Sequence, residues 1–366
     1  MQKSTIYFNP QINLISRTII IISKKISSLV ILTLLILCVP SYGKAQQYLI
    51  KFATLAPDGS TWMNVMKEYD QAVRKESGGR LGFKMYPGQI QGDEKDVLRK
   101  IRNGQLHSAG VTGNGLTEIA PKARILDSPF LFESYDEVDH VYQTFNTEFN
   151  QAFDNGGYVL LGWAEVGFVY VFTNTPVNKP EDMKGVKMWL WEGDPVAEAS
   201  FKALSINPIP LSITDVLTSL QTGLIDGVYT APLAAVALQW FTRVKYMMDY
   251  PLADAAGAVI ISKKKFNEMP PDIQEILTRN GKIYMAKLTK LSREDNAKAI
   301  ATLKKQGIQM IPPASQNVIT QLQQTGERAR QFLASGRLKE KGLTPEFVKR
   351  VETAIEDFRK GQKKNN

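Results

Sequence analysis

The chain has 366 residues and one cysteine, with 45 lysines and arginines against 36 aspartates and glutamates. Its formal net charge of +9 falls to +4 without the first 45 residues, which carry five basic and no acidic side chains. This net positive charge is small, and the sequence has no basic stripe interleaved with aromatic residues. We therefore predict no nucleic-acid binding. Because Cys38 lies within the first 45 residues, the rest of the chain can form no disulfide, thiolate nucleophile or cysteine metal site.

The first 45 residues are predicted to be a secretory signal peptide. Lys24 and Lys25 precede the apolar run 29–39, which is shorter than the ~20 residues that a membrane-spanning helix needs. Gly43 and Ala45 then satisfy the small-x-small cleavage pattern. We therefore expect cleavage after Ala45 and a periplasmic mature protein. An uncleaved anchor is the alternative, because the region before Lys24 is longer than in most signal peptides.

The elements after residue 45 alternate between strand and helix. Apolar alternation and helical spacing predict strands at 48–53, 81–86 and 108–111, with helices after Ser60 and at 93–103. The same signals predict strands at 158–163, 168–174, 185–191 and 223–229, with helices at 195–204 and 214–222. Three helices follow, at 271–306, 315–333 and 345–359. This order predicts an α/β fold with mainly parallel sheets and ligands at the carboxyl ends of the strands. The length of the mature chain predicts two domains.

The motif search favours binding over catalysis. The two histidines, His107 and His140, have no partner at metal-ligand spacing, so we predict no metal site. The run 110–115 (GVTGNG) lacks the lysine of a phosphate loop and is interpreted as a turn bordering a cleft. No Gly-x-Ser-x-Gly motif occurs. We therefore expect neither a cofactor nor an enzyme.

The segment 181–195 (EDMKGVKMWLWEGDP) carries two tryptophans at the end of a predicted strand. Strand residues alternate between faces, so Trp189 and Trp191 are expected to point the same way. Composition alone favours a place in the core for both. The alternative is a cleft wall, to which Glu192 and Asp194 would add polar groups.

Several short motifs, in this order and spacing, together resemble one family. They are Ala56-Pro57 with Ser60, Tyr86-Pro87-Gly88, 126–132 (LDSPFLF), 176–187 (PVNKPEDMKGVK) and, most specific, 220–227 (LQTGLIDG). With them the chain resembles a DctP-type solute-binding protein of a TRAP (tripartite ATP-independent periplasmic) transporter. The resemblance covers nearly all of the mature sequence.

The resemblance implies a two-lobed periplasmic-binding-protein (Venus flytrap) architecture, in which each lobe has a mixed or mainly parallel sheet flanked by helices. We expect lobe I to comprise 46–168 with about 256–290, and lobe II to comprise 169–255 with about 291–366. The long helix at 271–306 would brace both lobes. Binding would close the hinge between them. The closed receptor would deliver its small-molecule ligand to a membrane permease made of a small and a large subunit.

The chain departs from the family at the expected ligand contacts. Two positions after Lys187, relatives carry an arginine that clamps the ligand carboxylate, and here that position is Trp189. No arginine occurs from Gln151 to Ser200. The family asparagine near the DG motif is replaced by Thr230. A carboxylate buried against indole would be costly, so the usual organic-acid ligand is not expected.

We therefore predict an apolar, aromatic pocket for an uncharged, hydrophobic or aromatic ligand, or for an acid held by backbone amides. The predicted lining is Trp189, Trp191, Trp163, Phe168, Tyr229 and Trp62, with Thr112, Asn114 and Thr230 as polar groups. Trp62 could equally belong to the core face of the first helix. Alternatively, Glu192 and Asp194 beside Trp191 would attract a cationic ligand through charge and cation-π contact.

Two other functional classes stay open from the sequence. One is a periplasmic carrier or sensor that works with another soluble protein. The other is a periplasmic lyase or hydrolase. We expect a monomer, because an amphipathic C-terminal helix ordinarily packs on its own domain.

Overall fold

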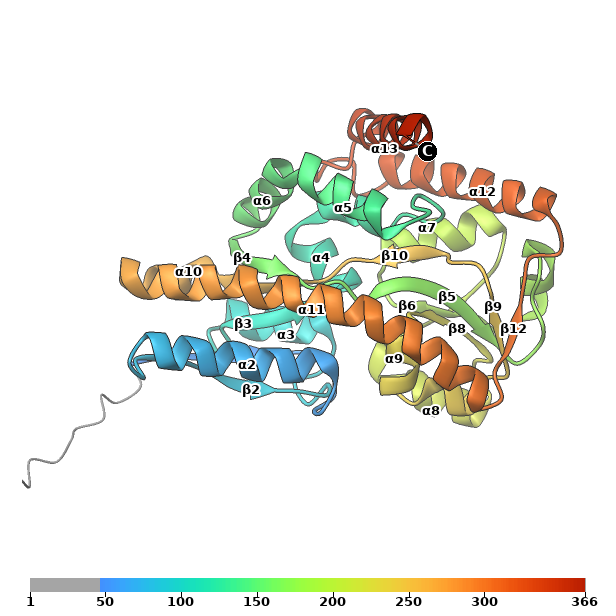
Figure 1. Ribbon diagram of the computed structural model, residues 1–366. Helices are drawn as coiled ribbons and strands as arrows, with labels where there is room; N and C mark the ends of the chain where they lie inside the picture. The colour runs from blue at the N-terminus through green and yellow to red at the C-terminus, as the bar shows by residue number, and fades with distance from the viewer. Residues whose placement is uncertain (1–46, 366) are drawn as a thin grey trace, which may run out of the picture. The chain divides into compact units, whose positions relative to one another are not determined.

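The structure is a computed structural model that describes residues 47–365 (Figure 1). The predicted signal peptide and its cleavage position lie outside the described residues. Among the helices of the described part, none has the length and apolar character needed to cross a membrane.

The first sheet has five strands in the order β2-β1-β3-β11-β4 and forms the base of lobe I. β1 pairs in parallel with β2 and β3, whereas β11 runs antiparallel to both β3 and β4, so the sheet is mixed. Its strands are β1 (Tyr48–Ala53), β2 (Leu81–Tyr86), β3 (Ser108–Val111), β4 (Tyr158–Trp163) and β11 (Ala258–Ser262).

Several helices of lobe I begin at a side-chain cap that precedes an apolar stripe. In α2 (Thr61–Glu76), the Ser60 hydroxyl accepts a hydrogen bond from the backbone N–H of Met63, and the stripe that includes Met66 and Tyr69 is buried. The other short helices of this lobe are α3 (Glu94–Arg102), α4 (Gly113–Ile119), η1 (Pro121–Asp127), α5 (Tyr135–Thr144), α6 (Asn146–Asn155) and α10 (Lys263–Asn267).

The second sheet is mostly antiparallel and forms the base of lobe II. β5 (Gly167–Thr173) pairs antiparallel with β8 (Gly227–Thr230), β9 (Tyr246–Met248) and β10 (Ala253–Ala255). β12 (Gln309–Ile311) extends it in parallel with β9, and β6 (Trp189–Trp191) pairs in parallel with β7 (Ile209–Leu211) as a separate ribbon. Helices η2 (Pro180–Gly185), α7 (Pro195–Leu204), η3 (Ile213–Asp215), α8 (Val216–Thr222), α9 (Pro232–Ala237) and η4 (Trp240–Arg243) belong to the same lobe.

The strand predicted over 185–191 is shorter in the structure. Residues 180–185 form η2, and regular pairing starts only at Trp189. Before it, the N–H of Lys187 donates to the side chain of Asp226, and Met188 makes a single isolated bridge with Gly227. A side-chain acceptor therefore takes the place of a ladder partner at the start of the predicted strand.

Two short neighbouring segments carry the chain between the sheets, and a long helix carries it across a third time. The segment 164–166 joins β4 to β5, and the segment 256–257 joins β10 to β11. Ala164 N–H donates to the Gly257 carbonyl of the second segment at 2.7 Å, and Val166 N–H donates to the carbonyl of Ala255 at the end of β10 at 2.9 Å. The long helix α11 (Pro271–Lys305) runs along both lobes and packs against α2, β4 and α9 (Figure 1). The predicted bracing helix over 271–306 is thus confirmed.

The C-terminal helices divide between the lobes. α12 (Gln316–Ser335) packs against α7 of lobe II. α13 (Pro345–Asn365) instead packs against α5, and Phe347 contacts Phe145 and Phe149 of lobe I. The apolar stripe of α13, which the sequence analysis placed in lobe II with the rest of 291–366, is thus buried against helices of lobe I as well as against α12.

Candidate functional site

A cavity of about 240 Å³ lies between the two lobes. Lobe I lines it with Trp62, Thr112 and Arg124, among others, and lobe II with Trp189, Val169 and Phe201. Most of the lining side chains are apolar. A site built from both lobes can hold a small molecule and can change its shape when the lobes move.

An aromatic stack forms the wall on the lobe II side. Trp189 is 2% exposed, and its ring lies 5.0 Å from that of Tyr229 and 6.2 Å from that of Trp191, while Trp240 meets it edge-on. The indole N–H of Trp189 donates to the Leu211 carbonyl at 3.0 Å. Trp189 is thus a core residue that also lines the cavity, which unites the two interpretations of its position.

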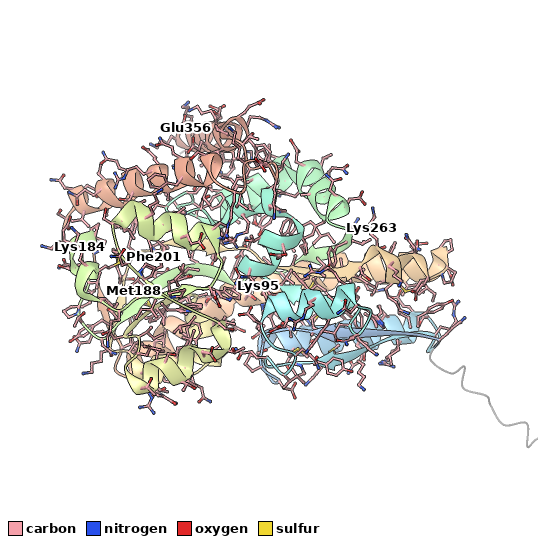
Figure 2. All side chains as sticks on the ribbon, turned by 180° about the vertical axis from the view of Figure 1, so that it is seen from behind. Lys95, Lys184, Met188, Phe201, Lys263 and Glu356 are labelled. Carbon is pink, nitrogen blue, oxygen red and sulfur yellow. The ribbon has the colours of Figure 1, made fainter. Side chains whose placement is uncertain are left out.

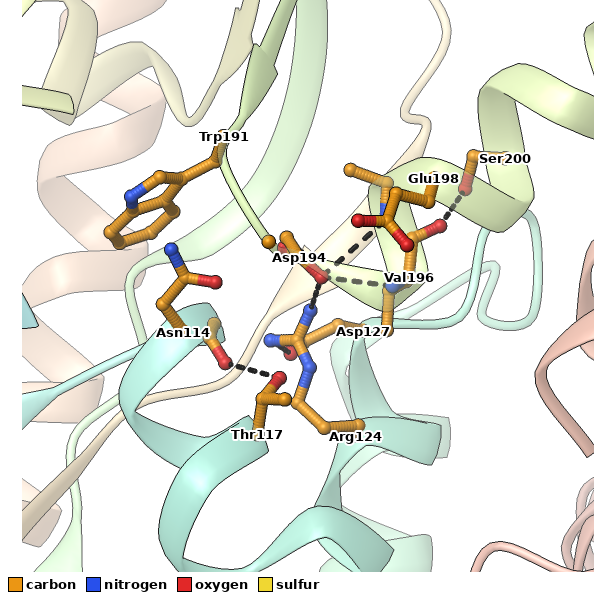
Figure 3. Close-up of polar contacts among 12 residues, drawn as sticks. Asn114, Thr117, Arg124, Asp127, Trp191, Asp194, Val196, Glu198 and Ser200 are labelled. Carbon is orange, nitrogen blue, oxygen red and sulfur yellow. Dashed lines mark hydrogen bonds and ion pairs between the residues drawn. The ribbon is translucent and has the colours of Figure 1, made fainter. Parts of the chain in front are cut away.

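A buried charged group also belongs to the cavity lining (Figure 3). Arg124 on η1 is 1% exposed and donates through Nη1 to Asp127 Oδ2 and through Nη2 to Asp194 Oδ1 at 2.6 Å. Asp194 begins α7 on lobe II, where the same oxygen accepts from the N–H of Val196 at 2.9 Å. The pair Arg124–Asp194 therefore joins the lobes at the cavity.

A second buried carboxylate, that of Glu94, lines the cavity beside this group. It accepts hydrogen bonds from the N–H and hydroxyl of Thr112 and from the N–H of Gly115 at 2.6–2.8 Å. Burial raises the pKa of Glu94 to about 7, outweighing these donors, which lower it. Its charge is thus sensitive to pH in the neutral range.

The glycines of the run 110–115 make room for these charged side chains. A Cβ atom at Gly113 would lie 2.8 Å from Nη1 of Arg124, and one at Gly115 would lie 2.9 Å from a carboxylate oxygen of Glu94. The run was interpreted as a turn, but 110–111 end β3 and 113–115 begin α4, with Thr112 between them. The glycines at 113 and 115 allow close packing against Arg124, Val111 and Glu94.

Contacts at the cavity edge hold the lobes together. Asp93 of lobe I accepts from the Trp191 indole at 3.0 Å and from the Ser212 hydroxyl at 2.7 Å, both on lobe II. Lys95 and Asn114 both donate to the carbonyl of Glu192. Figure 2 shows Lys95 at the boundary between the lobes, with Met188 and Phe201 on lobe II.

Six of the predicted site residues line the cavity: Trp62, Thr112, Trp189, Trp191, Tyr229 and Thr230. Trp62 also packs in the core of α2, as the alternative interpretation suggested. The Tyr229 hydroxyl is buried and accepts from the backbone N–H of Trp191 at 3.1 Å. The short stretch 229–230 thus contributes both an aromatic and a hydroxyl group to the wall.

Two aromatic residues that were predicted to line the pocket lie outside the cavity lining. Trp163 packs against Tyr142, Phe149 and Phe153 in the core of lobe I. Phe168 stacks on Tyr135 with ring centroids 4.5 Å apart. Neither is part of the cavity lining, so we correct their placement in the cleft. Helices α5 and α6 cover these rings, and strand periodicity does not reveal that cover.

Two predicted polar residues also lie outside the lining. Asn114 is 1% exposed and is held by the carbonyl of Glu192. The side chain of Glu192 is exposed to solvent. The cationic-ligand hypothesis based on Glu192 is therefore not supported by its position. The acidic residue of that segment that does line the cavity is Asp194.

Sequence reasoning missed Arg124, Asp127 and Glu94. A signal was present in the segment 123–132, where Arg124 and Asp127 stand three residues apart in an otherwise apolar run. Charges at that spacing inside an apolar segment are typical of a buried pair, because a lone buried charge is unfavourable. The described residues contain no group of three or more His, Cys, Asp or Glu side chains able to hold a metal ion.

Comparison with known proteins identifies the class of receptor. The family described as bacterial extracellular solute-binding protein, family 7 (DctP), matches residues 52–335. The chain belongs to this family. Its members are binding proteins for transport rather than enzymes, and they act in the periplasm with a membrane TRAP permease.

Individual relatives of this DctP-family protein are distant but similar over most of their length. The 2,3-diketo-L-gulonate-binding periplasmic protein YiaO of Escherichia coli is 27% identical over 252 residues, covering 67% of this chain and 75% of the relative. The C4-dicarboxylate-binding periplasmic protein DctP of Rhodobacter capsulatus is 24% identical over 273 residues, covering 72% and 79%.

The fold of this DctP-family protein matches solved TRAP solute-binding proteins. One from Haemophilus influenzae, with bound L-gulonate, superposes with a TM-score of 0.76 at 21% identity, covering 85% of this chain and 99% of that one. The predicted two-lobed architecture is thus confirmed.

Proposed function

We propose that this protein is the extracytoplasmic receptor of a TRAP-type secondary transporter and that it captures a largely apolar, uncharged solute. The observation that carries the proposal is the wall of the cavity, where Trp189 and Tyr229 stack at 5.0 Å in the position at which an arginine clamp is expected. The cavity lies between two lobes joined by short segments, an arrangement that supports capture by hinge closure.

The relatives with named ligands bind acids: 2,3-diketo-L-gulonate, C4-dicarboxylates and L-gulonate. A carboxylate in this cavity would have an indole where the clamp would be. The cation that does line the cavity, Arg124, is already paired with two carboxylates. Both features favour a solute without a carboxylate, because a buried anion needs a free cationic partner.

Membership of a transport family favours a receptor over a carrier that serves another soluble protein. The receptor would deliver its solute to the small and large membrane subunits of the permease. It would bind without turnover.

Mass spectrometry of the small molecule that co-purifies with the mature protein under native conditions tests this proposal. We expect a neutral, largely apolar compound. A co-purified dicarboxylate or sugar acid would overturn the apolar assignment while leaving the receptor role intact.

A thermal-shift comparison with succinate provides the matched control. We expect succinate to leave the melting temperature of the wild type unchanged. If succinate stabilises the wild type but not Trp189→Arg, then the aromatic position itself serves an acid and the proposal is wrong.

A further inference from the structure

On the lobe II side, the cavity is lined by members of two separate hydrophobic clusters. One cluster contains the aromatic wall of Trp189, Trp191 and Trp240. The other lies in the interior of the lobe, and its lining members include Val171, Met183, Met188, Phe201, Leu204 and Met248. The cavity therefore extends beyond the aromatic wall into the apolar interior of lobe II, in a region that we call the inner branch.

The inner branch lies between one face of the second sheet and helix α7. Side chains alternate along β5, so Val169 and Val171 share a face, and Val171 pairs with Tyr229 of β8 on that same face. From α7, the ring of Phe201 meets that of Tyr229 edge-on, with centroids 5.9 Å apart. Because Tyr229 also stacks on Trp189, it marks the place where the inner branch meets the aromatic wall.

The two regions offer a ligand different kinds of surface. Met183 in η2, Met188 just before β6 and Met248 in β9 all line the inner branch. A methionine side chain is unbranched and has three rotatable bonds, so such walls adapt to the shape of what they enclose. The aromatic wall consists instead of stacked rings, which present a flat and rigid surface.

The inner branch offers hydrocarbon contacts and little else. The members of its cluster are all apolar, and the neighbouring Ser200 uses its hydroxyl to donate to the Val196 carbonyl at 2.7 Å. A dry apolar cavity of about 150 Å³ is enough to bind benzene, and the whole cavity here measures about 240 Å³. In such surroundings each buried methylene group of a ligand strengthens binding about threefold to fourfold.

We propose that the solute carries a flexible saturated hydrocarbon chain, which enters the inner branch while the rest of the molecule lies against the aromatic wall. The inference rests on the proposed function and narrows the apolar solute to a compound with an alkyl or acyl chain. Affinity then rises with the length of the chain until the inner branch is filled.

The test measures chain-length dependence by isothermal titration calorimetry on the full mature chain. The probes are 1-hexanol, 1-octanol and 1-decanol, with 2-naphthylmethanol as a compact aromatic alcohol that has no chain. We expect the wild type to bind each alkanol about tenfold more tightly than the one two carbons shorter. Equal affinity for the three alkanols would overturn the inference.

Two variants change the size of the inner branch in opposite directions. Ala197 on α7 lines the cavity and belongs to the same cluster, so Ala197→Leu fills part of the branch. We expect it to weaken binding of 1-decanol at least tenfold and that of 2-naphthylmethanol less than threefold. Met183→Ala deepens the branch and should tighten binding of 1-dodecanol at least threefold.

Circular dichroism and the melting temperature establish that each variant is folded. Folded variants with the chain-length preference of the wild type would contradict a chain in the inner branch. If neither variant folds, the alkanol series on the wild type still decides the question.

Two further outcomes separate this inference from the proposed function. A wild type that binds 2-naphthylmethanol but shows no dependence on alkanol length overturns the hydrocarbon chain and leaves an apolar receptor cavity. A wild type that binds none of the probes, and co-purifies with a hydrophilic acid, overturns both.

Discussion

The indole ring of Trp189 lies over the ring of Tyr229, with centroids 5.0 Å apart and planes inclined by 20°. Replacing Trp189 with alanine removes this stacking and the hydrogen bond to Leu211, and we expect a loss of about 3–5 kcal/mol in the free energy of unfolding. Trp189→Phe keeps an aromatic ring, so its loss should be about 1–2 kcal/mol. Urea unfolding followed by circular dichroism measures both, and equal losses would contradict a stacking role.

Removing the cation between the lobes should be strongly destabilising. Arg124→Met leaves Asp127 and Asp194 buried without their partner, and we expect a loss of about 3–5 kcal/mol at pH 7. The matched control is Arg337→Met, since the pair Arg337–Glu198 is solvent-exposed and should contribute less than about 1 kcal/mol. Guanidinium chloride is unsuitable because it screens charge, so urea unfolding is the measurement. Similar losses in the free energy of unfolding for both variants would show that the buried ion pairs of Arg124 contribute no more to stability than the exposed pair.

Glu94 should make stability depend on pH. Its pKa rises from 4.5 to about 7 on folding, chiefly through burial, so the folded state holds the proton more tightly than the unfolded state. Proton binding to Glu94 therefore stabilises the folded state. This contribution to the free energy of unfolding is fully present below pH 4.5 and is lost as pH rises toward 7, by up to about 1.4 kcal/mol for each pH unit. Glu94→Gln removes the titration. We expect the difference in stability between variant and wild type to change with pH across this window, and a constant difference would refute the prediction.

Arg293 on α11 anchors the segment between the lobes. It forms two hydrogen bonds with Glu165, which is 0% exposed, and two with Asp139. Arg293→Gln should cost about 3–5 kcal/mol, because Glu165 then stays buried without a cation. Lys290→Gln, in the exposed pair with Glu294 on the same helix, should leave the midpoint of urea unfolding unchanged. A midpoint for Arg293→Gln that matches Lys290→Gln would contradict this role.

Gly281 sets the distance between α11 and β4. A Cβ atom there would lie 2.6 Å from the Leu161 carbonyl oxygen, so Gly281→Ala must push the helix from the sheet and should cost about 1–3 kcal/mol. The control is Gly361→Ala in α13, where no atom lies within 4 Å and alanine should stabilise by about 0.5–1 kcal/mol. Thermal unfolding of the two variants should therefore shift in opposite directions. An unchanged melting temperature for Gly281→Ala would show that α11 can move away from β4 without a cost in stability.

Local sequence patterns predicted most elements because they depend on near neighbours in the chain. The helix expected at 271–306 is α11 at Pro271–Lys305, and the strand expected at 108–111 is β3. The strand at 185–191 was predicted too long, because a distant side chain, Asp226, takes the N–H of Lys187. Local patterns contain no information about such a partner.

In the candidate site, too, local sequence patterns predict some features and distant contacts decide others. Trp163 and Trp189 are both aromatic residues of predicted strands, and strand periodicity alone does not distinguish them. Pairing of β4 in lobe I and the cover of α6 place Trp163 among Phe149 and Phe153, whereas Trp189 faces the cavity. Which aromatic residue lines the cavity depends on packing between elements that are far apart in the sequence.

By itself, the sequence determined the α/β fold and the two-lobed receptor class, because periodicity and motif order are properties of the chain. Only the tertiary structure decided the chemistry of the cavity. Arg124 and Asp194 are 70 positions apart, and they meet because the lobes bring η1 against the start of α7. The ionisation and pairing of buried charged groups depend on contacts between residues that are distant in the sequence, since the whole fold determines which groups are buried together.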